Sequence, residues 1–162
     1  MIRSQFVFFT VVFLFPILGW GQNPIGVWKA YDSEHKKPRS LIKIYEKEDR
    51  LWGKVIKLFR TQEENKNPLC FNCKKNDLRY NQPVLGMVLL KDLRKKNGVR
   101  WDQGEVLDPD TGNIYSCYLE MISKDKLKVR GYLGFSLFGR TKYMYRVEEH
   151  EEGTVEIISK LK

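Results

Sequence analysis

Hydrophobic and polar residues alternate along much of the chain with a period of two. The alternation is clearest in Lys126–Val129, and just before it Tyr115, Cys117 and Leu119 fall on one face of a segment. Such alternation is typical of a β-strand with one buried face. No stretch shows a convincing amphipathic helix of three turns. The pattern predicts strands at Val27–Tyr31, Ser40–Glu46, Leu51–Leu58, Val84–Lys91, Val99–Gln103, Glu105–Asp108, Asn113–Met121, Lys126–Leu133, Arg140–Val147 and Thr154–Ile158.

Turn signals between these segments favour a closed antiparallel sheet. Asp108–Gly112 has proline at its second position and ends on glycine, which suits a tight turn. Glycines also punctuate Arg130–Thr141, where the backbone must bend sharply or approach another chain segment closely. Many short strands at this spacing predict an all-β fold, a single antiparallel β-barrel of about 8–10 strands. Closure also removes the exposed edges that an open sheet would leave.

The N-terminus has the layout of a secretory signal. Arg3 precedes an apolar run of thirteen residues, Phe6–Leu18, and small residues follow at Gly19 and Gly21. The alternative is a membrane anchor, but the run is shorter than the roughly 20 residues that a spanning helix needs. No cysteine follows the run directly, so lipid attachment is not expected. The sequence therefore predicts a cleaved signal peptide, 1–21, and no transmembrane segment in the mature chain.

The remaining 22–162 suits one β-barrel domain, long enough to bury a core without relying on disulfides. The formal charge is +9, and loss of Arg3 with the signal leaves +8. A basic surface favours acidic partners such as lipid head groups or small anions, and export makes nucleic acid an unsuitable partner. A soluble basic surface with no partner is the alternative. The expected location is the periplasm of a Gram-negative bacterium, or its exterior.

Gly26-Val27-Trp28 opens the first predicted strand. It resembles the Gly-x-Trp that begins the first strand of lipocalins, where the tryptophan plugs one end of the barrel. An arginine from a late strand lies over that ring in a cation–π contact, and Arg146 is the matching candidate here. The alternative is that Trp28 is an ordinary core aromatic.

A longer series of short motifs carries a family resemblance. In chain order they are Gly26-x-Trp28, Asn81-x-Pro83-x-x-Gly86-Met87, Trp101-Asp-Gln-Gly104, Asp108-Pro-x-x-Gly112-Asn-x-Tyr115-Ser-Cys117, Leu127-Lys-Val-Arg-Gly-Tyr132 and Phe138-Gly-Arg-Thr141. Together they resemble the bacterial family catalogued as domain of unknown function 2147, over about Gly26 to Arg146. The resemblance implies an exported domain with a lipocalin-like β-barrel, and it implies no substrate. The acidic segment after Arg146 is less typical, and it leaves open whether Thr154–Ile158 adds a strand.

The three cysteines divide into a local pair and a single residue. Cys70 and Cys73 lie in a long polar connection, while Cys117 lies on an apolar strand face and is expected to be a free, buried thiol. In an oxidising compartment the leading interpretation of the pair is a structural disulfide. A redox pair, a zinc site and two free thiols remain alternatives. A redox pair would begin a helix after a strand, and zinc would need four ligands.

Few residues fit a catalytic or metal-binding pattern. Asp108, Asp110 and Asn113 superficially resemble a calcium loop, but the twelfth position is Leu119, where a bidentate glutamate is needed. His35 and His150 lie in charged stretches away from any nucleophile motif. The sequence therefore predicts no cofactor and no metal, and it leans away from an enzyme.

One basic constellation favours a ligand site. Two neighbouring predicted strands each carry cations on one face. These are Lys126, Lys128 and Arg130 on the first strand, and Arg140, Lys142 and Arg146 on the second. If the strands pair, these six form one stripe with Tyr132 among them. The alternative is a solvated outer face, and the stripe conflicts with a Trp28–Arg146 plug unless a bulge changes the register.

Arg130, Tyr132 and Arg140 are the predicted ligand-binding residues, because arginine beside glycine can approach a carboxylate or phosphate closely. The favoured function is a binding module for a small anionic or amphipathic ligand. The first alternative is an envelope-associated structural or interaction protein whose basic face meets lipid head groups or an envelope protein. An enzyme of unknown class is the second.

Overall fold

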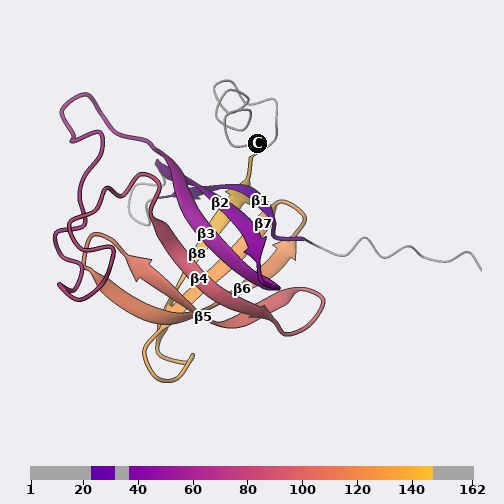
Figure 1. Ribbon diagram of the computed structural model, residues 1–162. Coiled ribbons are helices and arrows are strands. Elements are labelled where there is room, and N and C mark those ends of the chain that lie inside the picture. Colours follow the sequence, from indigo (N-terminus) through magenta and orange to yellow (C-terminus); the bar gives the residue numbers. More distant parts are fainter. Residues whose placement is uncertain (1–22, 32–36, 148–162) are drawn as a thin grey trace, which may run out of the picture.

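A computed structural model of the chain describes residues 23–31 and 37–147. Over these ranges the chain forms eight strands and no helix, as shown in Figure 1. The strands are β1 (Gly26–Tyr31), β2 (Pro38–Lys47), β3 (Arg50–Leu58), β4 (Val88–Lys95), β5 (Arg100–Asp108), β6 (Asn113–Ser123), β7 (Lys126–Tyr132) and β8 (Gly139–Arg146). The proposed signal peptide, the Thr154–Ile158 segment, His35 and His150 lie outside the described residues.

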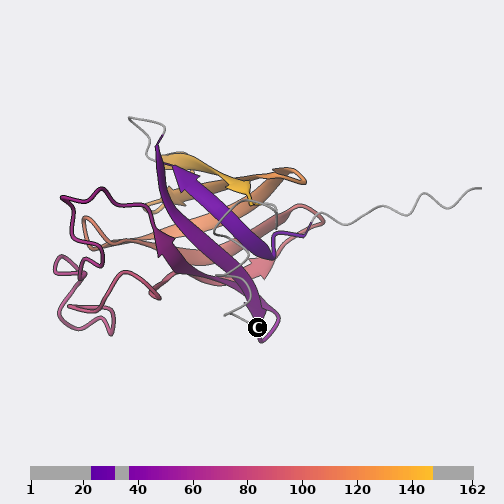
Figure 2. The same cartoon turned by 90° about the horizontal axis from the view of Figure 1, so that it is seen from above.

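Each strand pairs antiparallel with its neighbours in sequence, and β1 also pairs with β8, so that the sheet closes into a barrel. The predicted all-β antiparallel barrel is therefore confirmed. The turns after β2, β4 and β6 lie at one end, which we call the closed end. The long β3–β4 connection lies at the other, the open end, at the left of Figures 1 and 2. The β5–β6 turn and the β7–β8 loop share that open end.

The closed end is filled by Trp28, whose side chain is fully buried. Its indole N–H donates to the Pro24 carbonyl at 2.7 Å. The guanidinium carbon of Arg146 lies 4.3 Å from the Trp28 ring centroid, and the two residues are direct cross-strand partners. Arg146 also donates to the carbonyls of Asn23 and Ile25, at 2.6 and 3.0 Å. The structure thus brings together the pair that the Gly-x-Trp resemblance joined.

Gly26 is required beside this pair. Its φ is +137°, and a Cβ there would lie 2.7 Å from Nη1 of Arg146. A larger residue would therefore displace the arginine from the ring it covers.

Two predicted strands, Val99–Gln103 and Glu105–Asp108, are one strand, β5. The pairing with β6 shifts between Trp101 and Gly104, and Gln103 has a φ of 61°, so the strand bends there without ending. A Cβ on Gly104 would lie only 2.4 Å from Cγ of Leu93 on β4. The glycine that looked like a strand break instead allows β4 and β5 to pack closely.

The next strand boundary also differs from the prediction. β4 begins at Val88, four residues after the expected start at Val84. The residues between form a turn, with the Met87 N–H donating to the Val84 carbonyl at 3.1 Å and the Gly86 N–H donating to the Val55 carbonyl at 2.8 Å.

The interior holds one main hydrophobic cluster, contributed by all eight strands. Cys117 lies in it as a free, fully buried thiol, and burial raises its pKa to about 12. The thiol is therefore neutral and unreactive at physiological pH.

Candidate functional site

An open cavity of about 1350 Å³ occupies the open end of the barrel. Its strand residues come from β1 to β8, and the apolar ones are Ala30, Ile42, Val55, Leu58, Leu89, Leu90, Val106, Leu107, Val129 and Met144. Polar side chains such as Ser40, Asn113 and Tyr115, and several charged ones, line it as well. Leu90, Leu107 and Met144 belong to the main core cluster, so the cavity narrows onto packed side chains. An open space lined by both apolar and charged side chains is suited to a ligand with an apolar part and a polar part.

The register of β7 and β8 decides which cations face this cavity. Gly131 pairs with Arg140, and Val129 pairs with Lys142. Directly paired residues lie on the same face of a sheet. Val129 packs against the core cluster, so Arg140 and Lys142 are on the inner face. Gly131, which has no side chain, leaves space opposite Arg140.

The six-cation stripe is therefore wrong, although the two strands do pair. Arg130 pairs with Thr141, and Lys128 pairs with Tyr143. The cations of β7 lie on the outer face, whereas those of β8 lie on the inner face. The same register lets Arg146 reach Trp28 without a bulge between β7 and β8. Alternation within each strand was correct, but the sequence alone did not fix the offset between strands.

The three predicted ligand-binding residues separate accordingly. Arg140 and Tyr132 line the cavity mouth. Arg130 points away from it and holds the β7–β8 loop, donating to the carbonyls of Ser136 and Leu137 at 2.8 and 3.0 Å. It also donates to Oγ1 of Thr141 at 2.8 Å. Its role here is to shape the loop.

Four cations line the cavity, at Arg39, Arg60, Arg140 and Lys142. Two acids line it as well, Asp108 and Asp110, which leaves a formal charge of 4 − 2 = +2. Arg39 is bound to Asp110. Arg140 and Lys142 make no hydrogen bond or ion pair with any described residue. These two are cations without a counter-charge, facing an apolar space.

Arg60 adds an unsatisfied donor to this lining. Its Nη1 lies 3.7 Å from Oε1 of Glu64, but its Nε is buried and has no hydrogen-bond partner. A buried donor without a partner is costly, and an anion in the cavity is one group that would satisfy it. Sequence reasoning missed Arg39 and Arg60, because only barrel closure brings them into the same cavity lining as Arg140. Lys142 was one of the six cations of the predicted stripe. It lies two residues before the apolar Met144, so strand alternation places both side chains on the same face, and this was the sequence signal that Lys142 points inward.

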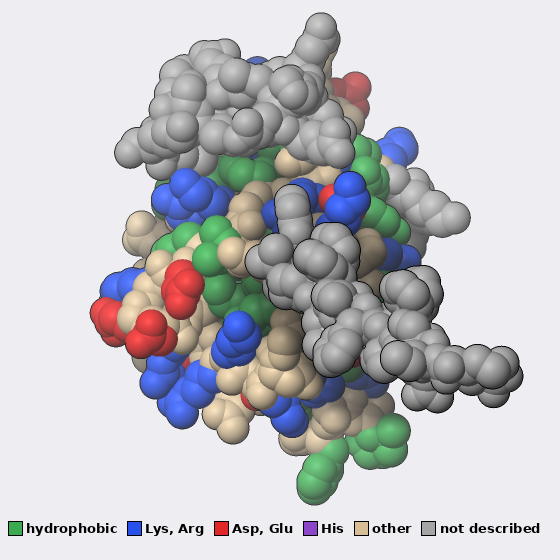
Figure 3. Space-filling view, turned by 90° about the vertical axis from the view of Figure 1, so that its right-hand side faces the viewer, with side chains coloured by type: hydrophobic (Ala, Val, Ile, Leu, Met, Phe, Trp, Pro, Cys, Tyr) green, Lys and Arg blue, Asp and Glu red, His purple; other side chains and the backbone are tan. Residues whose placement is uncertain are grey.

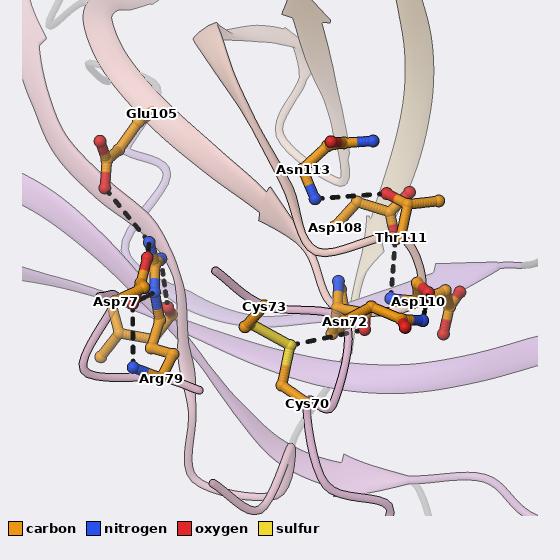
Figure 4. Close-up of a disulfide and its surroundings, with 12 residues drawn as sticks. Cys70, Asn72, Cys73, Asp77, Arg79, Glu105, Asp108, Asp110, Thr111 and Asn113 are labelled. Carbon is orange, nitrogen blue, oxygen red and sulfur yellow. Dashed lines mark hydrogen bonds and ion pairs between the residues drawn. A yellow bond between two sulfur atoms is a disulfide. The ribbon is translucent and has the colours of Figure 1, made fainter. Parts of the chain in front are cut away.

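A disulfide-bonded loop, drawn in Figure 4, contributes Phe71 and Asn72 to the lining of the mouth. The predicted bond between Cys70 and Cys73 is confirmed, with their Cα atoms 5.4 Å apart. The loop packs on the β5–β6 turn, where Asn72 Nδ2 donates to the Asp110 carbonyl at 2.6 Å. Gly112 makes this approach possible, since a Cβ on it would lie 1.7 Å from the Asn72 carbonyl oxygen.

Farther along the same connection, Arg79 forms a second attachment to the barrel wall. It binds Asp77 with its Nε and Nη2, at 2.9 and 2.8 Å, and its Nη2 lies 3.6 Å from Glu105 of β5. The disulfide loop and this ion-pair group hold the β3–β4 connection against β5 and the β5–β6 turn (Figure 4). The mouth is therefore bordered by fixed chain segments.

Residues 23–31 and 37–147 contain no group of three or more histidine, cysteine, aspartate or glutamate side chains arranged to hold a metal ion. The same residues form no helix of sufficient length and apolarity to cross a membrane.

Comparison with known proteins places the fold. The family described as "Uncharacterized protein conserved in bacteria (DUF2147)" matches residues 26–146. A solved structure of HP1028 from Helicobacter pylori, described as belonging to the lipocalin family, aligns with a TM-score of 0.65 at 17% identity, covering 85% of this chain and 97% of that one. A redesigned β-barrel aligns with a TM-score of 0.44 at 14% identity, covering 76% and 91%. No curated protein matches the sequence.

Proposed function

Because this chain belongs to the bacterial DUF2147 family and folds as a lipocalin-like barrel, we propose that it is a binding protein for a small amphipathic anion. The observation that carries the proposal is the pair of uncompensated cations, Arg140 and Lys142, over an apolar cavity. The apolar part of the ligand lies between the strands. Its carboxylate or phosphate lies at the mouth, where a planar guanidinium can donate two parallel hydrogen bonds.

Burial and charge both support this orientation. Placed head-first, a ligand would bring its charge against the Leu90, Leu107 and Met144 side chains, and an unpaired charge in such surroundings is strongly unfavourable. Placed tail-first, it removes apolar surface from water and offers acceptors to Arg140 and to the free Nε of Arg60. Tyr132 lies at the rim of the same mouth, although its pairing with Gly139 puts it on the same face of β7 as Arg130.

The test compares an anion with its neutral ester. Fluorescence titration with cis-parinaric acid and with its methyl ester measures the contribution of the charge, using wild type, Arg140→Ala and Lys142→Ala. Removing a buried charged contact costs about 2 kcal/mol or more, so each variant should bind the acid at least about thirtyfold more weakly. Both variants should bind the ester as wild type does.

Arg94→Ala is the matched control. Arg94 is an exposed arginine on β4, near the closed end and outside the cavity lining. It should bind both probes like wild type. If wild type binds no acidic probe, or if the two cavity variants bind the acid normally, the proposal is wrong, and an envelope interaction protein becomes the better hypothesis. Native mass spectrometry of protein from its own periplasm would then identify what it carries, if anything.

We also propose that the protein acts in the periplasm or outside the cell. The Cys70–Cys73 disulfide supports an oxidising compartment, and the N-terminal apolar run supports export.

A further inference from the structure

The β7–β8 loop, 133–138, exposes large hydrophobic side chains to solvent. Leu133 is 65% exposed, Phe135 80%, Leu137 78% and Phe138 73%. In Figure 1 the loop projects beyond the barrel at the bottom, and hydrophobic side chains project from the lower edge of the molecule in Figure 3. So many exposed apolar groups on one short loop are unusual for a soluble protein and mark a contact surface.

Hydrogen bonds shape the loop and satisfy three of its carbonyls. The Phe138 N–H donates to the Phe135 carbonyl at 3.1 Å, and Arg130 donates to the carbonyls of Ser136 and Leu137. A segment can leave water at low cost only when its backbone polar groups have partners. Three successive carbonyls of this loop meet that condition before any contact forms.

Cations lie next to the same loop. The strands on either side of it carry no aspartate or glutamate, and the cations nearest the loop in sequence are Arg130, Arg140 and Lys142, whereas Lys126 and Arg146 lie at the closed end. Arg130 and Arg140 lie at the two ends of the loop, within three residues of its apolar side chains. Cations beside an apolar tip match the layers of an anionic membrane surface, with charged head groups above acyl chains.

We propose that the β7–β8 loop docks the barrel onto an anionic lipid surface by inserting Phe135 and Leu137 among the acyl chains. A lipid surface fits better than a protein groove, because four exposed apolar side chains lie on one projecting loop whose two ends carry Arg130 and Arg140. Leu133 and Phe138 also line the cavity, so docking brings the mouth of the barrel to the membrane. The docking test is separate from the ligand test, because Phe135 and Leu137 do not line the cavity, although Arg140 belongs to both proposals.

Vesicle flotation tests the docking. Purified protein is mixed with vesicles of phosphatidylethanolamine and phosphatidylglycerol, or of phosphatidylcholine alone. Wild type should float with the anionic vesicles and much less with the neutral ones. Phe135→Ser/Leu137→Ser should lower partitioning about tenfold or more, since the buried apolar area is lost. Leu78→Ser is the matched control: Leu78 is 97% exposed but lies on the β3–β4 connection, and this variant should float like wild type.

Insertion itself is measured with Phe135→Trp and brominated lipids. Its added fluorescence should shift to shorter wavelength on anionic vesicles and be quenched by bromine on the acyl chains. Three results would each overturn the proposal. These are no flotation of wild type, equal losses in the loop variant and in Leu78→Ser, and flotation without quenching of the added tryptophan, which would place the loop outside the acyl region.

Discussion

Arg146 shows how much one side chain can organise in a barrel this small. Its guanidinium covers Trp28, and it donates to the carbonyls of Lys124, Ile25 and Asn23. The closed end therefore depends on a single cation shared among the N-terminal segment, the β6–β7 turn and the buried indole. Burial lowers the pKa of Arg146, yet three carbonyl acceptors and an aromatic face stabilise its charged form.

Replacing Trp28 with alanine tests the plug. The side chain is fully buried, so Trp28→Ala should lower the free energy of unfolding by about 3–5 kcal/mol, measured from denaturant midpoints. Trp52→Ala is the comparison, since Trp52 is only half-buried and its indole N–H has no partner. It should cost about 1–2 kcal/mol. A loss below about 1 kcal/mol for Trp28→Ala would show that Trp28 is peripheral.

Asp77 should make stability depend on acid pH. Hydrogen bonds from the Arg79 side chain lower the pKa of Asp77 from 3.8 to about 2, although partial burial opposes the shift. A carboxyl with a lowered folded-state pKa stabilises the protein above its unfolded pKa and loses that contribution as pH falls through the folded value. Wild type should lose about 1–2 kcal/mol between pH 5 and pH 2 that Asp77→Asn does not lose. Parallel stability–pH curves for the two proteins would contradict this assignment.

Residue roles followed from sequence only where the motif itself encoded the contact. Gly26, Trp28 and Arg146 are such a case, because a resemblance supplied both the pair and its geometry. Arg130 and Arg140 are the opposite case. Both are arginines next to a glycine. They do not pair with each other: Arg130 pairs with Thr141 and Arg140 pairs with Gly131, so the two side chains lie on opposite faces of the sheet. This register sends Arg140 into the cavity and Arg130 to the outer surface.

At the scale of elements, the disulfide loop and the β5–β6 turn form one unit. Gly112 should be its most sensitive point, because a Cβ there meets the Asn72 carbonyl oxygen and its φ is +71°. Gly134→Ala is the matched control: its φ is +66°, but nothing lies within 4 Å of the added carbon. Gly112→Ala should therefore cost at least about 2 kcal/mol more in unfolding free energy than Gly134→Ala. Equal costs would show that the loop does not need this contact.

Most strands could be predicted because alternation and turn residues agreed, as they do around Asp108–Gly112. The two misjudged regions have local reasons. Gly104 carries no side chain because Leu93 occupies the space, and a bulge there resembles a chain break in sequence. Val84–Met87 is apolar like a strand. Its backbone groups instead form hydrogen bonds within a turn, to Val55 on β3 and to Pro68 earlier in the β3–β4 connection.

For the whole molecule, closure of the barrel assembles a cavity lining from residues that lie on different strands. Arg39 and Arg140 are the second residues of β2 and β8, and Arg60 follows β3, yet all three line one cavity. Sequence patterns predicted the barrel and the basic character of its last strands. They could not predict the mouth, because its composition depends on which strand ends meet when β1 pairs with β8.

Export is the remaining whole-molecule prediction. The apolar run Phe6–Leu18 and the small residues up to Gly21 predict cleavage before Gln22. A cut before Gln22 would leave Asn23 in the mature chain, and the Asn23 carbonyl accepts a hydrogen bond from Arg146 at 2.6 Å. N-terminal sequencing of protein from the cell envelope should begin at or near Gln22. Mature protein that retains Met1 would contradict the prediction. The Cys70–Cys73 disulfide would then have to form outside an oxidising compartment such as the periplasm.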